Sequence, residues 1–432
     1  MARFGSQRPN AVAVQELETL VRTAVFKSAH ARVGFLLQQA ADPVDATSQP
    51  KPGQHRKGRE NLEVQGMFGR FVVQRDYYYD PQNQQGHSPA DAALGLEISY
   101  TPALARLMCL EGADEPSFQK AEEHLRETGG IEVSGRQIQR VVQRIGPAAQ
   151  QWQHREVPPE ACAAPVLYVS ADGTGVPMRK EERAGRKGKQ PDGSAKTRLA
   201  YLGCVFTQHQ CDEQGHPMRD HDSTSYVCSF DSLEGLGLIL RQEARRRGSG
   251  TAHQIVLLID GASGLENLGR INFPGCVPIV DFYHALEHLD DLLEALWGKD
   301  PPDFKKQFGR WTKCLLKDRV EKIIAQAREW SAGTASEAAV EKQLNYFVSN
   351  VARMQYGTFR KLGFFIGSGV IEAGCKTVIG SRCKQSGMFW SEPGAENILA
   401  LRCVKSSRQW NNFWKARANE HAAHNDVLPL AA

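Results

Sequence analysis

The feature that most constrains this chain is an ordered run of short apolar segments between residues 164 and 281. Three expected strands come first, and two units of a helix followed by a strand come after them. The five expected strands cover residues 164–172, 197–207, 223–230, 254–260 and 276–281. The two expected helices cover 231–247, which Asp231 or Ser232 would cap, and 264–271. The order β-β-β-α-β-α-β predicts a mixed sheet with helices on its faces.

Ribonuclease H-like nucleases are built in this order, so the expected fold class is α/β with a ribonuclease H-like mixed sheet over 160–284. Residues 285–363 then read as helical. A block of roughly 80 residues is too long for a loop and indicates an inserted helical subdomain. Residues 364–416 return to the core and end in a helix, and 417–432 are expected to be a frayed tail.

The N-terminal part reads as mostly helical. Residues 11–40 predict a helix with one apolar face. That face consists of Leu17, Leu20, Val21, Ala24 and Val25. Residues 41–64 are polar and read as a linker, so a helix and a linker make up a first region of 1–60. Residues 66–79 suggest a hairpin within a second region of 61–150.

Residues 116–146 of this second region read as a helix-turn-helix. Ser134 and Gln137 form a capping box that opens the second helix. One face of this helix is apolar, with Ile138, Val141, Val142 and Ile145. The other face carries Arg136, Gln139, Arg140, Gln143 and Arg144. Such a face suits phosphates and base edges in a major groove, and it is equally typical of a solvated helical hairpin.

Composition neither requires nor excludes nucleic acid as a partner. Lysine plus arginine total 53 and aspartate plus glutamate 49, a net charge of +4, so the distribution of charge has to decide. The longest apolar runs, such as 255–259, fall far short of the roughly 20 residues that a membrane helix needs. The first ten residues have no apolar core behind their arginines, so we expect no secretory signal and a cytoplasmic protein. None of the ten cysteines stands in a C-x-x-C pair, which predicts reduced thiols and no zinc.

Two aspartates end two of the expected buried strands: Asp172 in SADGTG and Asp260 in IDGASG. A glycine follows each, which lets the chain turn sharply and exposes the carboxylate at the edge of the sheet. A single aspartate at such a place is more often a cap of the following turn. For two on neighbouring strands, a shared divalent cation is the better account, because it removes the repulsion between close carboxylates.

Further candidates come after the last expected strand. Asp281 and His284 stand in DFYH, where the histidine either contributes to a site or simply packs. Glu372 lies among glycines in GSGVIEAGCK and would share a helix face with Lys376, either as a third carboxylate or as half of a salt bridge. The basic side chains near it are Lys376, Arg382 and Lys384. Three carboxylates beside a basic surface are what a metal-dependent phosphodiester enzyme needs. Residues 179–198 add a basic loop that could follow a DNA backbone.

Taken together, ADGTG, IDGA, DFYH and SGVIEAGCKTVIGSRCKQSGMFWS resemble bacterial insertion-sequence transposases of the ISKra-four family. The resemblance covers about residues 11–405, and its C-terminal segment is the most specific part. It implies a ribonuclease H-like core whose D-D-E triad binds two Mg²⁺ or Mn²⁺ ions. On the matching positions the triad would be Asp172, Asp260 and Glu372. Glu396 is the rival third carboxylate, because Arg402 lies six residues after it.

One departure concerns the N-terminal region. Family members often carry cysteine pairs there, suggestive of a zinc ribbon, whereas this chain has Asp80 and Asn83 at the expected positions. The resemblance therefore implies either a degenerate copy or a fold that persists without the metal.

The expected function is that of an insertion-sequence DNA transposase: hydrolysis of a phosphodiester at the ends of the element, then attack of the freed 3′-hydroxyl on target DNA. His284 would position the scissile strand, and Arg382 and Lys384 would hold phosphates. Trp297 or Trp390 would stack on an unpaired base or, more simply, pack in the core. The expected partners are the transposon ends, target DNA and further copies of the chain, with the protein on the nucleoid when bound. The alternatives are a ribonuclease H-like nuclease without strand transfer and an inactive, transposon-derived DNA-binding protein.

Overall fold

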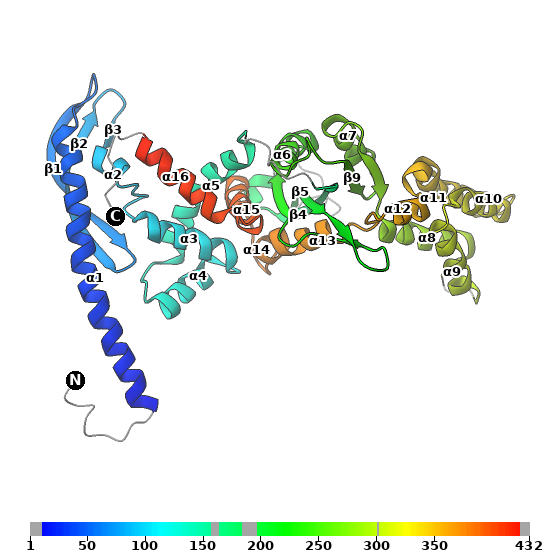
Figure 1. The fold of residues 1–432 in the computed structure, drawn as a ribbon, viewed down its shortest axis with the longest axis horizontal. Helices are drawn as coiled ribbons and strands as arrows, with labels where there is room; N and C mark the ends of the chain where they lie inside the picture. Colours follow the sequence, from blue (N-terminus) through cyan, green and yellow to red (C-terminus); the bar gives the residue numbers. More distant parts are fainter. Residues whose placement is uncertain (1–10, 157–163, 184–196, 300–301, 424–432) are drawn as a thin grey trace. The chain divides into compact units, whose positions relative to one another are not determined.

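The computed structural model describes residues 11–156, 164–183, 197–299 and 302–423, and Figure 1 shows their elements. The chain divides into two compact units. The first consists of residues 1–145 and 411–432, and the second of residues 146–410. Among the described residues, no helix is both long enough and apolar enough to cross a membrane.

The first unit begins with a long helix and a hairpin. These are α1 (Ala11–Thr47), β1 (His55–Gly66), β2 (Gly69–Asp80) and the short β3 (Gln85–His87). The expected linker over 41–64 is therefore replaced by the end of α1 and a strand. β1 escapes detection because its polar side chains are mostly exposed on both faces, so it lacks the alternation that marks a half-buried strand.

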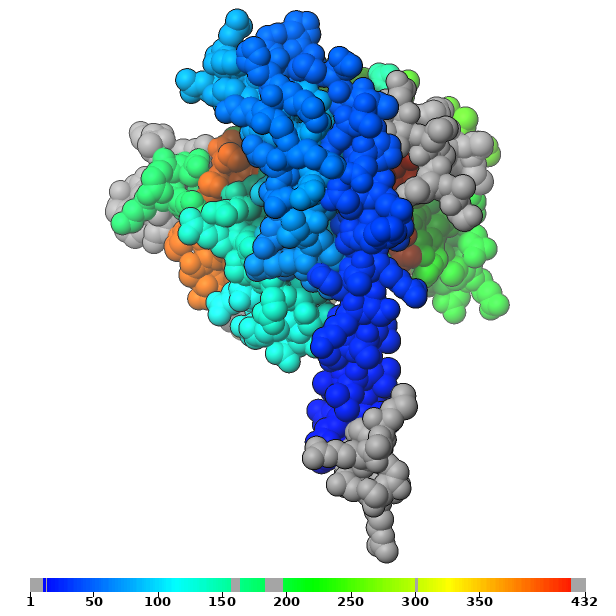
Figure 2. Space-filling model, turned by 90° about the vertical axis from the view of Figure 1, so that its left-hand side faces the viewer, coloured from blue at the N-terminus to red at the C-terminus, as the bar shows by residue number. Residues whose placement is uncertain are grey.

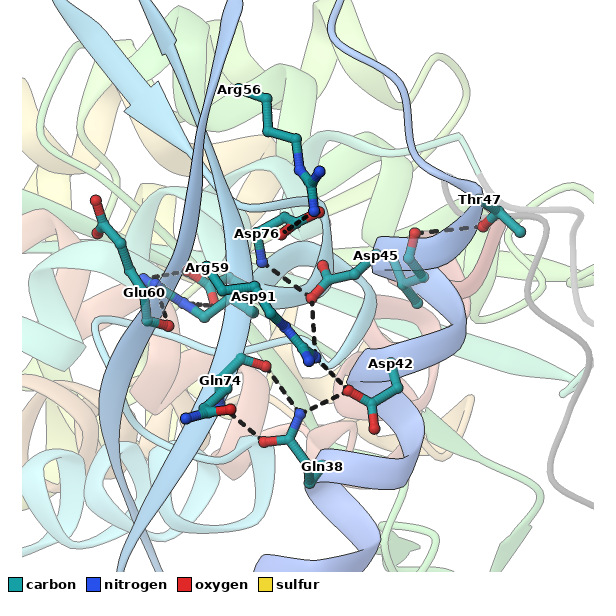
Figure 3. Close-up of polar contacts among 12 residues, drawn as sticks. Gln38, Asp42, Asp45, Thr47, Arg56, Arg59, Glu60, Gln74, Asp76 and Asp91 are labelled. Atoms are coloured by element: carbon teal, nitrogen blue, oxygen red, sulfur yellow. Dashed lines mark hydrogen bonds and ion pairs between the residues drawn. The ribbon is translucent and has the colours of Figure 1, made fainter.

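A polar network joins the C-terminal part of α1 to this hairpin (Figure 3). The Gln38 amide donates to the carbonyl of Gln74 at 2.9 Å and accepts from its N–H at 2.8 Å. Arg56 donates from Nε and Nη2 to the two carboxylate oxygens of Asp76, each at 2.8 Å. Two further ion pairs belong to the same layer: Arg59 with Asp42, and Arg75 with Asp91.

The remaining helices of the first unit contain the expected helix-turn-helix. They are α2 (Pro89–Ala93), α3 (Pro102–Asp114), α4 (Phe118–His124), the π-helical turn η1 (Leu125–Gly129) and α5 (Gly135–His154), which continues into the second unit. α16 (Trp410–Ala423) lies mostly in this unit. The expected frayed tail is helical as far as Ala423, and Arg417 forms an ion pair with the buried Glu97.

The second unit is built on a five-stranded mixed sheet. Its strands are β4 (Val166–Pro177), β5 (Thr197–Gln208), β8 (Ser225–Ser229), β9 (Gln254–Ile259) and β10 (Val277–Val280). The spatial order is β10-β9-β4-β5-β8. β5 is antiparallel to β4 and β8, and β9 is parallel to β4 and β10. The predicted mixed sheet is confirmed, and its order is compatible with a ribonuclease H-like fold.

One face of this sheet is buried under α6 (Leu233–Arg246) and α7 (Ser263–Asn272). Alternate residues of the central strand, Leu167, Val169 and Ala171, enter that core. Side chains of a strand alternate between faces, so the residues between them belong to the other face. Tyr168 stacks there on Phe206 with ring centroids 4.7 Å apart.

Between β10 and the end of the core lies the expected helical insertion. It consists of α8 (Phe282–Trp297), α9 (Phe304–Leu315), α10 (Val320–Ser331), α11 (Glu337–Asn350) and α12 (Tyr356–Lys361). Its helices bury Trp311, Leu315, Val340, Leu344 and Phe347 completely. Trp297 stays 37% exposed and stacks on Trp330 with centroids 5.4 Å apart.

The chain then returns to the sheet in a nearly continuous helical run. It consists of α13 (Gly369–Gly374), the π-helical turn η4 (Cys375–Gly380) and α14 (Ser381–Cys383), followed by α15 (Glu392–Ser406). α13 and η4 contact β4, and α13 also contacts β5. The buried Arg402 on α15 donates to the carbonyls of Thr377 and Val378, which fixes the π-helical turn in place.

Candidate active site

β4 and β9 place Asp172 and Asp260 at the same level on one face of the sheet. The last pair of their parallel ladder joins Ser170 to Leu258. Each aspartate lies two residues beyond this pair, and two residues along a strand return to the same face. Ala171 and Ile259 point to the face under α6 and α7, so both carboxylates belong to the opposite face.

The chain takes a different course after each of the two aspartates. After Asp260 it turns at Gly261, whose φ of +94° is the left-handed conformation that glycine allows. After Asp172, β4 continues to Pro177, because β5 stays paired with it on the other side. The prediction that Asp172 ends a strand is therefore wrong. On the side of β4 that faces β9, however, Asp172 has no strand partner, because β9 ends at Ile259.

Both carboxylates are partly exposed and accept hydrogen bonds from neighbouring groups. Asp260 Oδ1 accepts from the N–H of Ala262 at 2.8 Å, so the capping interpretation holds for one of its oxygens. Asp172 Oδ1 accepts from the N–H of Gly173 at 2.6 Å, and its Oδ2 accepts from the thiol of Cys375 at 3.5 Å. Burial, with the negative charge of Asp172 next to it, raises the pKa of Cys375 to about 12, so this thiol is a donor at neutral pH.

Asp281 lies beside Asp260 but plays a different part. The β9–β10 ladder pairs Ile259 with Val280, so the next residues are neighbours. Asp281 is buried; its Oδ1 accepts from the N–H of His284 at 2.6 Å and its Oδ2 from the N–H of Ser368. It therefore caps α8 and anchors the segment that leads into α13. Because it is buried, unlike Asp172 and Asp260, and both its oxygens hold backbone groups, Asp281 is a positioning residue.

Glu372 comes to this site on α13. Its Oε1 accepts from the hydroxyl of Ser368 at 3.1 Å, and the side chain is exposed. Ser368, one turn before Glu372, is bonded to Asp281, while Cys375, three residues after it, is bonded to Asp172. The helix carrying Glu372 is thus held at both ends by the aspartates of the sheet.

The rival Glu396 lies elsewhere in the second unit. It is on α15, which contacts the edge strand β8, and it lines a cavity of about 210 Å³ with Cys228 and Asp231. β5 and β4 separate β8 from β9. Burial raises the pKa of Glu396. Its neighbourhood is therefore distinct from that of Asp172 and Asp260.

The basic residues of the segment divide into exposed and buried ones. Lys376 is exposed, and Lys384 donates to the hydroxyl of Thr174, two residues beyond Asp172 on β4. Arg382 is fully buried, with its guanidinium 4.9 Å from the ring centroid of Trp390, and burial lowers its pKa to about 10. The expectation that Arg382 holds phosphates does not fit this burial. Trp390 packs in the core, as the simpler interpretation had it.

Sequence reasoning missed the residues that support Asp260 from the insertion. Tyr346 on α11 donates its hydroxyl to the carbonyl of Asp260 at 3.1 Å and stacks on His288 with centroids 3.6 Å apart. A Cβ at Gly261 would lie 3.0 Å from the Tyr346 ring, so the turn after Asp260 and this ring fit closely. The His284 ring lies edge-on to His288, and its Nδ1 is 3.1 Å from Glu287. No local motif marks Tyr346, because only the fold brings α11 to this turn.

The first unit holds the candidate DNA-binding surface. The capping box is confirmed: the N–H of Ser134 donates to Gln137 Oε1 at 2.8 Å, and the N–H of Gln137 donates back to Ser134 Oγ at 3.3 Å. The four apolar residues of α5 are buried, and Arg136, Arg140 and Arg144 are exposed. Arg144 also lies 3.5 Å from Glu97. Most of the expected basic loop, residues 184–196, lies outside the described residues.

At the two positions where family members carry cysteines, the side chains form the hydrogen bonds of a turn. Asp80 accepts from the N–H groups of Gln82 and Asn83, and the Asn83 amide donates to its other oxygen at 2.8 Å. Elsewhere in the unit, Glu111, Glu115 and His124 bring three possible ligand atoms within 4.8 Å of one another. His124 Nδ1 lies 2.6 Å from Glu111, so an ion pair already accounts for this cluster.

Comparison with known proteins adds one distant likeness. No protein-family model matches the chain, and a search of curated proteins finds no match. Among solved structures, the chain is similar to a chain of the "Drosophila P element transposase strand transfer complex". The two share 13% sequence identity with a TM-score of 0.25, over 75% of this chain and 80% of that chain.

Proposed function

We propose that this chain is an insertion-sequence DNA transposase of the ISKra-four type, which hydrolyses phosphodiesters at the ends of the element and joins the freed 3′ ends to target DNA. The observation that carries the proposal is the placement of Asp172 and Asp260 at one level on one face of the sheet, with the Glu372 helix bonded to both Asp172 and Asp281. Asp260 lies at the carboxyl end of β9, where sites form in open α/β sheets, and Asp172 lies level with it within β4.

The donor set fits hard divalent cations. Asp172, Asp260 and Glu372 offer carboxylate oxygens, which Mg²⁺ and Mn²⁺ prefer. None of these three forms an ion pair with a described lysine or arginine, so their negative charge is not neutralised there. In the proposal these three side chains hold two ions. When bound, two such ions activate water and stabilise the leaving oxygen of an in-line displacement.

The surrounding residues orient the three carboxylates. Ser368, held by Asp281, donates to one carboxylate oxygen of Glu372. The thiol of Cys375 fixes one oxygen of Asp172. Tyr346 holds the backbone of Asp260 from the insertion. Carboxylates whose rotamers are fixed in this way lose little entropy when they bind an ion, which is the value of such supporting contacts.

DNA contact is proposed for two surfaces, one in each unit. On α5, Arg136, Arg140 and Arg144 would face a major groove. Near the carboxylates, Lys376 and Lys384 would contact phosphates, and His284 would position the scissile strand. A transposase acts on two element ends, so more than one copy of the chain is expected on DNA.

The central test compares two glutamates on neighbouring helices. Glu372→Gln and Glu396→Gln make the same chemical change, one at the site and one at the β8 edge. We expect Glu372→Gln to abolish Mg²⁺-dependent cleavage of DNA that carries the sequences flanking the coding region, and Glu396→Gln to retain it. Loss of cleavage only in Glu396→Gln would overturn the assignment of the third carboxylate.

The alternatives differ in products. An assay with labelled ends and a supercoiled target separates joined from merely cleaved DNA. Cleavage without joined products would support a nuclease without strand transfer. Binding without any metal-dependent cleavage would support an inactive DNA-binding protein.

A further inference from the structure

The N-terminal half of α1 carries large apolar side chains that the described residues leave uncovered. Their exposed fractions are 65% for Val12, 49% for Val14, 40% for Leu17, 59% for Leu20, 50% for Val21 and 56% for Val25. Figure 2 shows this part of the helix, in the deepest blue, extending past the hairpin of β1 and β2. Single exposed apolar residues are ordinary, whereas a contiguous patch of this kind marks an interaction surface.

These side chains lie on one face of the helix. At 3.6 residues per turn, six positions fall within an arc of about 140°. They are Val14, Leu17, Leu20, Val21, Ala24 and Val25. Within residues 14–28 only Ser28 interrupts this arc, and Val12 lies outside it. The predicted amphipathic pattern is therefore present, but the described residues do not bury its apolar face.

The other side of the helix is the one that contacts its own unit. The Phe26 ring packs edge-on against Phe68 with centroids 5.5 Å apart, and Arg22 donates to the carbonyl of Thr128 at 3.2 Å. His30 Nδ1 lies 3.2 Å from the carbonyl of Phe68. These residues occupy the arc opposite to Leu17 and Val21. The apolar face thus points away from the hairpin, and the described residues of the first unit leave it free for a partner.

The charges along the apolar face indicate which molecule fits. One margin carries Glu16 and, further along, Lys27; the other carries Glu18. In two identical helices that pair antiparallel, each margin meets its own counterpart in reverse. On the first margin, Glu16 of each copy then faces Lys27 of the other. A parallel pair would instead place Glu16 of each copy beside Glu18 of the other, which costs energy through like-charge contacts.

We propose that two copies of this chain associate through an antiparallel pairing of their α1 helices, with a two-fold axis near Leu20 and Val21. Leu17 of one copy packs opposite Ala24 of the other, and Glu16 of one lies about 3 Å along the axis from the level of Lys27 of the other, within reach of an ion pair. The interface is isologous, since the same face serves in both copies. It rests on α1 alone and is independent of the proposed catalytic function.

The first test uses the full-length chain and two matched valines. Sedimentation equilibrium should give a dimer for the wild type at micromolar concentration. Val21→Glu places two charges at the axis, and we expect it to weaken association by at least about 100-fold. Val12→Glu, off the apolar arc, should leave association unchanged. Circular dichroism checks that both variants stay helical. A monomeric wild type, or a Val21→Glu variant that still dimerises, would overturn the proposal.

The second test addresses the direction of the pair. Glu16→Lys brings two lysines together at each end of an antiparallel pair, and Lys27→Glu brings two glutamates together. Each change alone should weaken the dimer several-fold at low salt. Combining both in one chain restores opposite charges and should restore the affinity. A double variant that is as weak as the single ones would contradict the antiparallel arrangement.

Discussion

The two units treat their carboxylates in opposite ways. In the first unit, Asp42, Asp76 and Asp91 each form an ion pair with an arginine of the hairpin. In the second, Asp172 and Asp260 accept hydrogen bonds from backbone N–H groups. No ion pair among the described residues reaches these two. The two sets therefore differ in whether the protein itself supplies the positive charge.

Burial explains the difference in part. Asp76 is 1% exposed, and a charge buried to that degree needs a paired partner within the fold. Asp172 and Asp260 are only partly buried, so water or a bound ion can solvate them. A carboxylate cluster that lacks arginine and opens to solvent is thus the better candidate for a cation site. The comparison can be tested by changing one acid in each cluster.

The largest effect is expected from Asp172→Asn. Loss of one carboxylate from the site should reduce metal-dependent DNA cleavage by about 10³-fold or more, because such sites supply several kcal/mol of transition-state stabilisation. Thermal unfolding should occur at the same temperature or slightly higher, since a repulsive charge has gone. Cleavage at the wild-type rate would remove Asp172 from the mechanism.

Asp76→Asn should act on stability instead. The change removes the buried carboxylate that pairs with Arg56. We therefore expect the first unit to lose about 1–3 kcal/mol of unfolding free energy. Chemical denaturation followed by circular dichroism measures this loss. Metal-dependent cleavage at permissive temperature should stay within a few-fold of wild type. If Asp76→Asn were as stable as wild type, the ion pair of Arg56 with Asp76 would not contribute to the stability of the first unit.

A smaller effect is expected on the free energy of unfolding. Adding Mg²⁺ should raise it through the carboxylates of the second unit and not through those of the first. Binding to the folded state stabilises the wild type by about 1.4 kcal/mol when Mg²⁺ is present at ten times its dissociation constant. Differential scanning fluorimetry with and without Mg²⁺ should show this increment in Asp76→Asn as well. Asp172→Asn should lose most of it. An equal Mg²⁺ response in all three proteins would place the cation outside the proposed site.

The smallest effect concerns His124, a histidine beside two glutamates, whose charge depends on pH. The hydrogen bond and charge of Glu111 raise the pKa of His124 above 6.5. A raised histidine pKa contributes stability that is complete below pH 6.5 and is lost as pH rises through the folded-state value. Because the side chain is 44% exposed, we expect less than about 1 kcal/mol. Unfolding of wild type and His124→Gln between pH 6 and pH 9 should show this slope only in the wild type.

The sheet could be predicted from sequence because its signals are local. The apolar run 254–260 became β9, and the elements around it fell in the expected order. The capping box at Ser134 was equally readable. The same patterns allow the prediction that Asp172 and Asp260 lie on neighbouring strands, because it depends only on which strands form and which of them are adjacent.

The rest depended on contacts between distant segments. Arg382 reads as a surface cation, yet it is buried against Trp390. Ser368 and Tyr346 support the site only because α11 and α13 return to the ends of β9 and β10. β1 was missed because a strand with two polar faces carries no periodic signal. Such features arise from tertiary packing, which overrides local propensity.

The π-helical turn η4 carries one residue more per turn than an α-helix would. A wide turn of this kind absorbs the additional residue locally, so the helical segments before and after it keep almost the register of a continuous α-helix. Inserting or deleting a residue outside this turn, where nothing absorbs the change, would rotate everything downstream by roughly 100° relative to α13. Lys384 would then leave Thr174, although no side chain at the site had been altered. The spacing between the acidic and the basic half of this segment is therefore itself under structural constraint.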